Sequence, residues 1–442
     1  MKDVFLIPAL LLLLTMVGGQ AYCQTEAKVL SLEDAISLGL KNNSYLKIAD
    51  TRVDLAAARL QQVKDGRLPQ AGASMQYARL YLLSPFSLSE EMTLPANHFD
   101  AMIGAVSVSK EIFDGFLDKA KHETNVALVQ ASKMDAAKDR EDIRYNITSL
   151  YYNIYKISKS EDIINENLRL LDEREREASN MLKEGVLLSN DLLKIQLQKS
   201  NLQVTKVDIK DAMEVSLYNL SILTGMPDDQ PLEIDTNLFL GEHVLSTVED
   251  LAGIGLLSRN EIKAAEYRVT AAEGGLKQLK SAYLPHVDVS AMYLYLNPMV
   301  PQHFIPQKGG FLQALNLGLS VKYNIGSLYG LKGKKQEATL NIVQAENAIA
   351  VQRDQIKLEV FKQYKAYQSS VEKIAVSEVA YKQANKSFQL SSSQFRNGLL
   401  LSGDLMQSQN LLLQSQLNVL QAKIDAQLAY YRLEKAIGGS IK

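Results

Sequence analysis

The sequence is poor in the side chains that build catalytic and metal centres. Its 442 residues include one cysteine, no tryptophan and five histidines, and Cys23 alone excludes an internal disulfide. The histidines lack the close spacing that holds a metal ion. The glycine-lysine segment at 330–335 lacks the first glycine and the final Ser or Thr of a phosphate-binding loop. We therefore expect neither an enzyme nor a bound metal or other cofactor.

Charge of one sign and long hydrophobic runs are also scarce. The formal net charge is -2, so the chain has no basic surface for nucleic acid and no acidic tail. After residue 24, no stretch holds 18 consecutive apolar residues, the length typical of a helix that crosses a bilayer. Any crossing of a membrane would have to be made by β-strands.

Residues 1–23 have the pattern of a secretory signal peptide. Lys2 precedes an apolar run from Val4 to Val17 that is too short to span a bilayer, and small residues follow it. Cleavage after Ala21 and cleavage after Cys23 fit equally well. Residues 20–23 match the lipid-attachment motif poorly, so we expect Cys23 to leave with the signal or to remain as an unpaired thiol.

Proline is absent from two long stretches, 96–226 and 307–442. Because proline breaks helices, such stretches are typical of very long helices, and a helix over about 119–184 would be roughly 100 Å long. Heptad spacing of apolar residues inside both stretches predicts packing as coiled coils. The positions are Leu150, Ile157, Ile164, Leu171 and Ala178 in the first, and Val360, Tyr367, Ile374, Tyr381, Phe388 and Phe395 in the second.

Two segments ahead of each long helical stretch alternate with period two, which predicts half-buried strands. The predicted pairs are 70–82 with 102–112 and 286–296 with 312–323, and strands of about 11 residues are long enough to cross a bilayer. The polar face of the last strand is expected to line a water-filled lumen and consists of Asn316, Gly318, Ser320 and Lys322. Aromatic residues near the strand ends suit girdles at the membrane surfaces, with chance placement as the alternative: Tyr77, Tyr81, Phe99, Phe113, Tyr293, Phe304, Phe311 and Tyr329.

The two halves of the chain share one plan. Leu68-Pro69 recurs 216 positions later as Leu284-Pro285, and the turn that begins at Gly185 recurs 213 positions later at Gly398. We expect a first repeat at 24–225 with a helix hairpin at 115–225, a linker at 226–246, and a second repeat at 247–442 with a helix hairpin at 328–437.

Both hairpins turn at a Gly-x-x-Leu-Ser-x-Asp motif. In one interpretation Asp191 and Asp404 form a ring of carboxylates that narrows a pore. In the other, each stabilises the first turn of a return helix, with Ser189 and Ser402 as N-caps. The leucines of the motif either pack among themselves or form an apolar patch for a partner protein. The residues alone leave both choices open.

Four membrane strands cannot form a closed barrel, and an open edge in lipid leaves backbone groups unpaired at a cost of several kcal/mol each. Two copies of the chain would supply eight strands and three would supply twelve, and only the larger barrel leaves an aqueous lumen. We therefore expect a homotrimer.

The order of helix, Leu-Pro, strand, loop, strand, long helix, Gly-x-x-Leu-Ser-x-Asp turn and return helix, used twice, resembles the TolC-like outer-membrane efflux family. The resemblance covers essentially all of the mature chain. It implies a mainly α fold with membrane β-strands, in which a trimeric 12-stranded β-barrel continues into a periplasmic α-barrel tunnel of long antiparallel coiled-coil helices. It implies an outer-membrane location in a Gram-negative bacterium and passive export from the periplasm to the exterior.

The resemblance also implies partners and site residues. The partners would be a periplasmic adaptor, an inner-membrane pump of the RND or ABC type and outer-membrane lipid, with no nucleic acid. The implied periplasmic gate consists of Asp191, Asp404, Phe395 and Gln407, where Gln407, and Lys194 in the first repeat, replace a second acid of the family pattern. The implied adaptor contacts are Gly185, Val186, Leu187, Leu188, Ser189, Gly398, Leu399, Leu400, Leu401 and Ser402.

Two other classes of protein are compatible with the sequence. One is a secreted coiled-coil scaffold or adhesin without channel activity, which would be soluble without detergent. The other is an enzyme on a helical frame, which the missing catalytic groups disfavour. The sequence does not identify the exported substrate, because the predicted lumen face has polar side chains but no group selective for one class of molecule.

Overall fold

The computed structural model describes residues 28–439, with gaps at 82, 90–91, 95–97, 228–231, 237, 239–240, 242 and 300–311. The predicted signal peptide with Cys23 lies outside the described residues, as do Phe304 and Phe311 of the predicted aromatic girdles.

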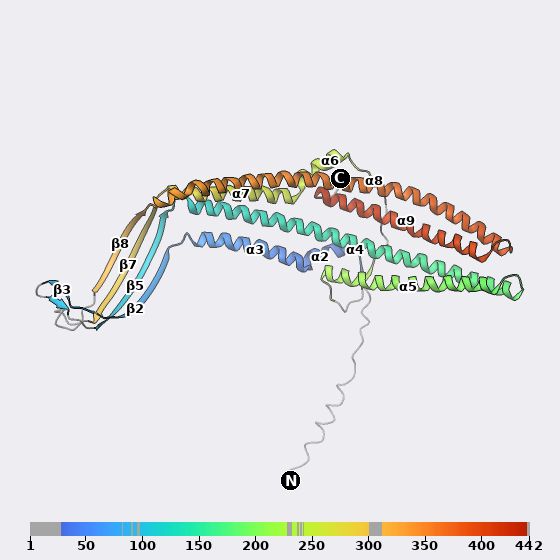
Figure 1. The fold of residues 1–442 in the computed structure, drawn as a ribbon, viewed down its shortest axis with the longest axis horizontal. Coiled ribbons are helices and arrows are strands. Elements are labelled where there is room, and N and C mark those ends of the chain that lie inside the picture. The colour runs from blue at the N-terminus through green and yellow to red at the C-terminus, as the bar shows by residue number, and fades with distance from the viewer. Residues whose placement is uncertain are drawn as a thin grey trace, which may run out of the picture. The chain divides into compact units, whose positions relative to one another are not determined.

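Helices make up most of the described chain (Figure 1). The α-helices are α2 (Leu32–Asn42), α3 (Ser44–Asp65), α4 (Leu117–Lys183), α5 (Ser189–Thr224), α6 (Val248–Ser258), α7 (Asn260–Lys280), α8 (Leu331–Arg396) and α9 (Ser402–Ile437). Two short 3-10 helices, η1 (Ser281–Tyr283) and η2 (Gly326–Gly330), stand at junctions between helices and strands. No α-helix in the described part of the chain is both long and apolar enough to cross a membrane.

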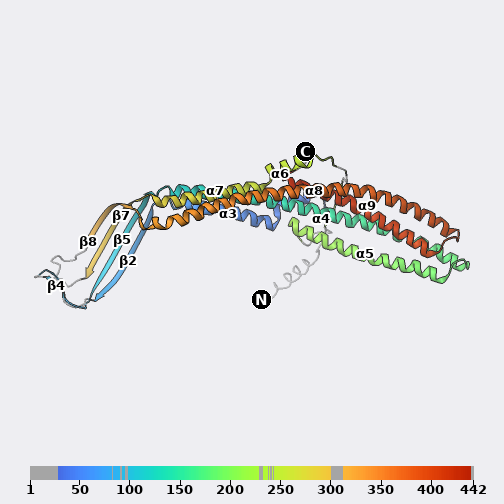
Figure 2. The ribbon, with the colours of Figure 1, turned by 45° about the horizontal axis from the view of Figure 1, so that its top comes forward.

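The strands form three sheets. A four-stranded antiparallel sheet has the order β2 (Gln70–Tyr81), β5 (His98–Phe113), β7 (His286–Met299) and β8 (Leu312–Lys322), and Figures 1 and 2 show these strands side by side. The smaller sheets pair β1 (Lys28–Leu30) with β6 (Leu232–Ile234) in parallel and β3 (Phe86–Ser89) with β4 (Met92–Leu94) in antiparallel.

Three details differ from the sequence predictions. β5 and β7 extend beyond their predicted ends because the extra residues find partners. Residues 297–299 of β7 pair with 100–102 of β5, and residues 98–99 of β5 pair with β2. The segment 84–100 has the turn-forming composition of a loop, with prolines at 85 and 95, but it contains the β3–β4 hairpin. The sequence predicts one helix from Leu32 to about Gly66, ended by Leu68-Pro69. In the structure this helix is broken at Asn43, whose ψ of 130° is not helical and whose side-chain amide donates to the carbonyl of Leu223 at 2.9 Å.

The described chain divides into two compact units, which do not coincide with the two predicted repeats. Among the described residues, one unit comprises those of 28–43, 144–241 and 369–428, and the other comprises those of 44–143, 243–368 and 429–439, so each unit takes parts of both halves of the sequence. The first unit holds the hairpin turns, and the second holds the four-stranded sheet.

In the first unit, α5 runs back along α4 and α9 runs back along α8 (Figure 1). The core of this unit is built from heptad positions that the sequence predicted, among them Ile164, Leu171, Ala178, Phe388 and Phe395, all buried. Lys199 on α5 bridges Asp172 and Glu175 on α4, at 2.7 and 2.9 Å. Apolar heptads therefore set the core of the hairpins, and ion pairs fix the register of α4 against α5.

The parallel β1–β6 pair is held by a buried tyrosine on α4. The hydroxyl of Tyr151 lies 2.8 Å from the carbonyl oxygen of Leu30 and 3.0 Å from that of Asp235. Tyr151 is fully buried, and this burial raises the pKa of its phenol to about 12. The neutral phenol thus joins the end of β1 to the chain just after β6.

We expect the stability of this unit to fall in alkaline solution. The pKa of Tyr151 is about 12 in the folded chain against 10.0 for the free phenol, so the folded state holds the proton more tightly. The stabilisation is complete below pH 10 and is lost as the pH rises towards 12. Tyr151→Phe should remove this pH dependence and cost about 1–2 kcal/mol at pH 8, because both hydrogen bonds are lost. Urea unfolding at pH 8 and pH 11 measures both effects.

Tyr267→Phe provides the matched control, since Tyr267 lies on α7 and is more than a third exposed. Its unfolding curves should follow those of the unmodified chain at both pH values. An unchanged pH dependence in Tyr151→Phe would contradict the assignment to this phenol.

Candidate functional site

The two hairpin turns have the same backbone conformation. Gly185 and Gly398 have φ values of 77° and 69°, in the left-handed region that glycine adopts without strain. The next N–H, of Val186 or Leu399, donates to a carbonyl five residues back at 2.9 Å in both turns. Each long helix therefore ends in the same glycine-dependent cap.

Apolar side chains alternate outwards and inwards along both turns. Val186, Leu188, Leu399 and Leu401 are 61%, 74%, 77% and 70% exposed. Leu187 and Leu400 instead pack against the buried cluster that contains Phe395 and Leu405. Gly185, Ser189 and Gly398 are exposed, and Ser402 is buried. Of the ten predicted adaptor contacts, the structure leaves four apolar side chains available to a partner.

The turns are linked to each other through Asp191 and Ser402. Both residues are buried, and the Ser402 hydroxyl donates to Oδ1 of Asp191 at 2.5 Å. Lys194 Nζ lies 3.4 Å from the same oxygen. The carboxylate of the first turn is thereby held by the second turn rather than presented to solvent within the single chain.

The predicted N-caps are wrong. The N-cap of α5 is Leu188, which makes no side-chain cap bond, and Ser189 is the first helical residue. Ser402 is likewise the first residue of α9, and its hydroxyl bonds to Asp191. In both turns the leucine before the serine supplies the backbone carbonyl that begins the helix: Leu188 accepts from the Asp191 N–H at 2.9 Å, and Leu401 accepts from the Leu405 N–H at 3.3 Å.

The remaining predicted gate residues are dispersed. Asp404 and Gln407 are exposed on α9, and neither makes a hydrogen bond or ion pair with the described residues. Phe395 is fully buried at the end of α8. Among the gate residues, Asp404 and Gln407 are thus the ones whose polar groups face solvent.

Sequence reasoning missed two buried polar residues on α4. Asn167 and Arg174 are 2% and 6% exposed, and they stand three residues after the heptad positions Ile164 and Leu171. Arg174 bonds to Ser392 on α8 and to Glu177. The sequence held a signal for these two residues. A heptad seam has two core positions in every seven residues, and the prediction used only the position of Ile164 and Leu171.

The four-stranded sheet separates polar from apolar side chains. On β8, Asn316, Gly318, Ser320 and Lys322 share one face with the residues opposite them on β7, which include Ser290 and Asp288. Lys322 pairs with Asp288 at 3.2 Å. The other face of β8 carries four apolar side chains that are 64–74% exposed: Leu315, Leu317, Leu319 and Val321. In the single chain, this apolar face is uncovered.

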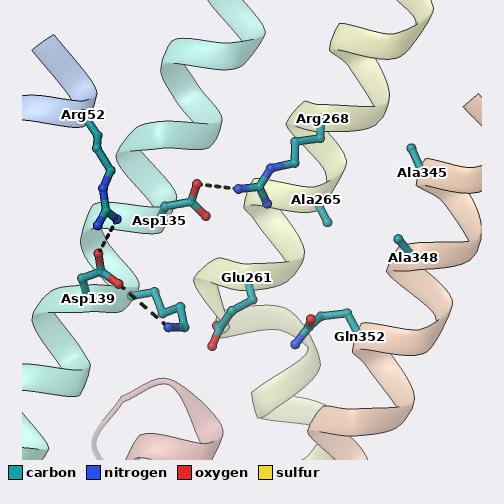
Figure 3. A pocket seen from close by; sticks show the side chains of 10 residues that line it. Arg52, Asp135, Asp139, Glu261, Ala265, Arg268, Ala345, Ala348 and Gln352 are labelled. Atoms are coloured by element: carbon teal, nitrogen blue, oxygen red, sulfur yellow. Dashed lines mark hydrogen bonds and ion pairs between the residues drawn. The ribbon is translucent and has the colours of Figure 1, made fainter. Parts of the chain in front are cut away.

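A polar pocket of about 480 Å³ lies among α3, α4, α7 and α8 in the second unit (Figure 3). Arg52 on α3 and Arg268 on α7 both reach α4, where they pair with Asp139 at 3.4 Å and Asp135 at 2.5 Å. The basic lining residues are balanced by the acids, which include Glu261. Such half-exposed pairs are worth about 0–1 kcal/mol each, so the pocket is an interhelical ion-pair lattice rather than a binding site for one charge.

The second half of the chain matches a known family. Residues 253–439 match the family model described as outer membrane efflux protein. Over these residues the chain is similar to the TolC-like outer membrane efflux proteins. This similarity confirms the resemblance seen in the sequence, with an outer-membrane location and a role in efflux.

Relatives of this chain extend the similarity over more than nine tenths of its length. Outer membrane efflux protein BepC of Brucella suis biovar 1 is 20% identical and covers 97% of this chain and 89% of its own length. The toluene efflux pump outer membrane protein TtgC of Pseudomonas putida is 21% identical over 92% of this chain and 83% of its own. Both are named as efflux proteins rather than enzymes.

Solved structures show the same fold. The outer membrane protein VceC from Vibrio cholerae superimposes with a TM-score of 0.75 at 17% identity, over 93% of this chain and 97% of VceC. The outer-membrane channel OprN superimposes with a TM-score of 0.77 at 16% identity, over 92% and 90%. At these identities the likeness concerns the fold alone.

Proposed function

We propose that the protein is the outer-membrane channel-tunnel of a tripartite efflux or secretion system. Three copies would form a 12-stranded barrel and a periplasmic helical tunnel. The tunnel would open at the hairpin turns, and the protein would perform no catalysis. The observation that carries the proposal is the four-stranded sheet, with one apolar face, one polar face and two unpaired edges among the described strands.

The unpaired edges require further copies of the chain. Among the described strands, β2 pairs only with β5 and β8 pairs only with β7. In lipid, each unpaired backbone group costs several kcal/mol, so β8 of one copy must meet β2 of the next. Three copies then supply twelve strands, with the face of Asn316, Gly318, Ser320 and Lys322 lining the lumen.

An exposed apolar stripe on α5 supports the same assembly. Seven large side chains on this helix are between 54% and 69% exposed, at spacings of three, four, seven or eight residues: Leu193, Leu197, Val204, Val207, Val215, Tyr218 and Ile222. This spacing is typical of a coiled-coil seam that lacks its partner helix. A neighbouring copy in a trimer would cover it.

Matching contacts 213 or 216 positions apart support the twofold repeat. Ser31 and Thr247 each accept a bond from the N–H three residues on, at 3.1 and 3.2 Å. Asn43 and Arg259 each donate to a carbonyl near the end of a return helix, that of Leu223 or Ala436. Corresponding residues of the two halves thus form corresponding helix ends.

The hairpin turns are the proposed docking and gating elements. The exposed Val186, Leu188, Leu399 and Leu401 would contact a periplasmic adaptor, which connects the tunnel to an inner-membrane pump of the RND or ABC type. Asp404 would face the entrance as a single acidic ring, with the neutral Gln407 beside it. Asp191, being buried against Ser402, would hold the two turns together in the closed state.

A secreted scaffold is the second candidate, and the sheet argues against it. Its exposed leucines on β8 would be an aggregation hazard in water, whereas lipid would cover them.

Fractionation and conductance test the proposal. We expect a heat-modifiable trimer in the outer membrane and discrete single-channel currents in planar bilayers. Soluble protein in the absence of detergent, with no currents after reconstitution, would favour the scaffold instead.

A further inference from the structure

A second cavity lies where the strands meet the helices. It has a volume of about 430 Å³ and lies in the second unit, between the start of α4 and the end of α7 with η1. Its lining includes Phe116, Lys119, Glu123, Lys277, Lys280 and Leu284. β5 ends at Phe113 and β7 begins at His286, so the cavity adjoins the helical end of the sheet.

A strained turn holds an aromatic ring at this cavity. Gly115 and Phe116 have φ values of 64° and 68°, and Phe116 is the non-glycine residue with positive φ in the described chain. A Cβ on Gly115 would lie 2.7 Å from the carbonyl oxygen of Ser281, so the turn is packed tightly against η1. Phe116 is 62% exposed, and its ring meets the ring of Phe113 edge-on, with 5.4 Å between the ring centroids. The positive φ of Phe116 costs about 1–2 kcal/mol of backbone strain, and in this conformation the phenyl ring lies on the surface.

The cavity lining carries more positive than negative charge. Lys277 is paired with Glu123 at 2.9 Å, and this contact, with a smaller contribution from Lys119, holds the pKa of Glu123 below its usual value. Lys119 and Lys280 are exposed and lie within ion-pair distance of no acid among the described residues. The charges of Lys277 and Glu123 cancel each other. The lining therefore has a net charge of two positive units, from Lys119 and Lys280, beside the exposed Phe116 ring and Leu284.

The same combination occurs at the other junction between a strand and a long helix. Tyr329 and Lys332 stand 213 positions after Phe116 and Lys119, and Tyr329 is 87% exposed. An aromatic ring followed by a lysine three residues on is typical of a chain segment at a membrane surface, where the ring meets acyl chains and the ammonium meets headgroups.

We propose that this cavity binds the phosphodiester headgroup of a phospholipid in the inner leaflet of the outer membrane. Lys119 and Lys280 would contact the phosphate oxygens, and Phe116 and Leu284 would lie against the glycerol and the first methylenes of the acyl chains. This inference rests on the proposed function to the extent that the sheet crosses the membrane and sets the cavity at the headgroup level.

The test uses the full chain in detergent and a soluble lipid, dihexanoyl phosphatidylglycerol, with inorganic phosphate as the comparison ligand. Bound lipid is counted by native mass spectrometry. Lys119→Gln combined with Lys280→Gln should weaken lipid binding at least about tenfold, because two charge-assisted contacts are lost. Lys47→Gln combined with Lys362→Gln, which removes the same charge from exposed lysines elsewhere in the second unit, should leave binding within about twofold.

Phe116→Gly separates the apolar contact from folding. Glycine adopts the positive φ without strain, so the thermal midpoint should not fall, whereas lipid binding should weaken. Equal lipid affinity in the two double variants would overturn the proposal. Inorganic phosphate binding as tightly as the lipid would also overturn it and would indicate a site for free anions.

Single-channel currents recorded on the same preparations separate the two proposals. Currents that persist while lipid binding is unaffected by the lysine variants would reject the lipid site alone. Absent currents in the unmodified chain would reject the channel.

Discussion

Replacing Val186, Leu188, Leu399 and Leu401 by aspartate should abolish capture of the cognate periplasmic adaptor by the protein. These side chains are the exposed apolar residues of the two turns, and burying each against a partner is worth about 1.5–3 kcal/mol. Loss of all four should weaken binding at least about 100-fold. Co-purification with the adaptor and surface plasmon resonance measure the effect, while the thermal midpoint should stay unchanged because the side chains already face solvent.

Two sets of variants control this experiment. Val244→Asp with Leu257→Asp changes highly exposed apolar residues away from the turns and should leave adaptor binding intact. Leu187→Asp with Leu400→Asp changes the inward-facing leucines, and it should lower the thermal midpoint because these side chains pack against the buried cluster. Adaptor binding that survives the fourfold change would exclude the turns as the docking surface.

Removing the Ser402 hydroxyl should loosen the contact between the two turns and make the channel open more often. In Ser402→Ala, the buried Asp191 carboxylate keeps only Lys194 at 3.4 Å, and a buried acceptor that loses its donor costs about 1–3 kcal/mol. We expect a lower unfolding midpoint in urea and more frequent open events in planar bilayers.

Ser189→Ala is the matched control, because Ser189 occupies the corresponding position of the first turn and is exposed. Ser189→Ala should change neither the unfolding midpoint nor the frequency of open events. A double-mutant cycle between Ser402→Ala and Asp191→Asn should give a coupling energy of about 0.5–3 kcal/mol. A coupling near zero would show that the hydrogen bond does not stabilise the closed arrangement.

Local periodicity was sufficient to predict the helices and strands near their observed positions. Proline-free heptads such as Ile164, Leu171 and Ala178 require a long helix with one buried seam, and the alternation from Leu315 to Val321 requires a strand. Strand ends were less accurate, because β7 is extended by pairing with β5 and β5 by pairing with both β7 and β2, and that pairing is not encoded within any one segment.

The sequence by itself determined the sites of the hairpin turns, since Gly185 and Gly398 adopt a φ that other residues avoid. Only the tertiary structure decided what the turn residues do. Asp191 and Ser402 are 211 positions apart, and their bond exists because two hairpins pack together and exclude water from both side chains. The lysines beside Phe116 likewise come from helices far apart in the chain. Contacts of this kind depend on which faces of separate elements meet, a property that no single segment carries.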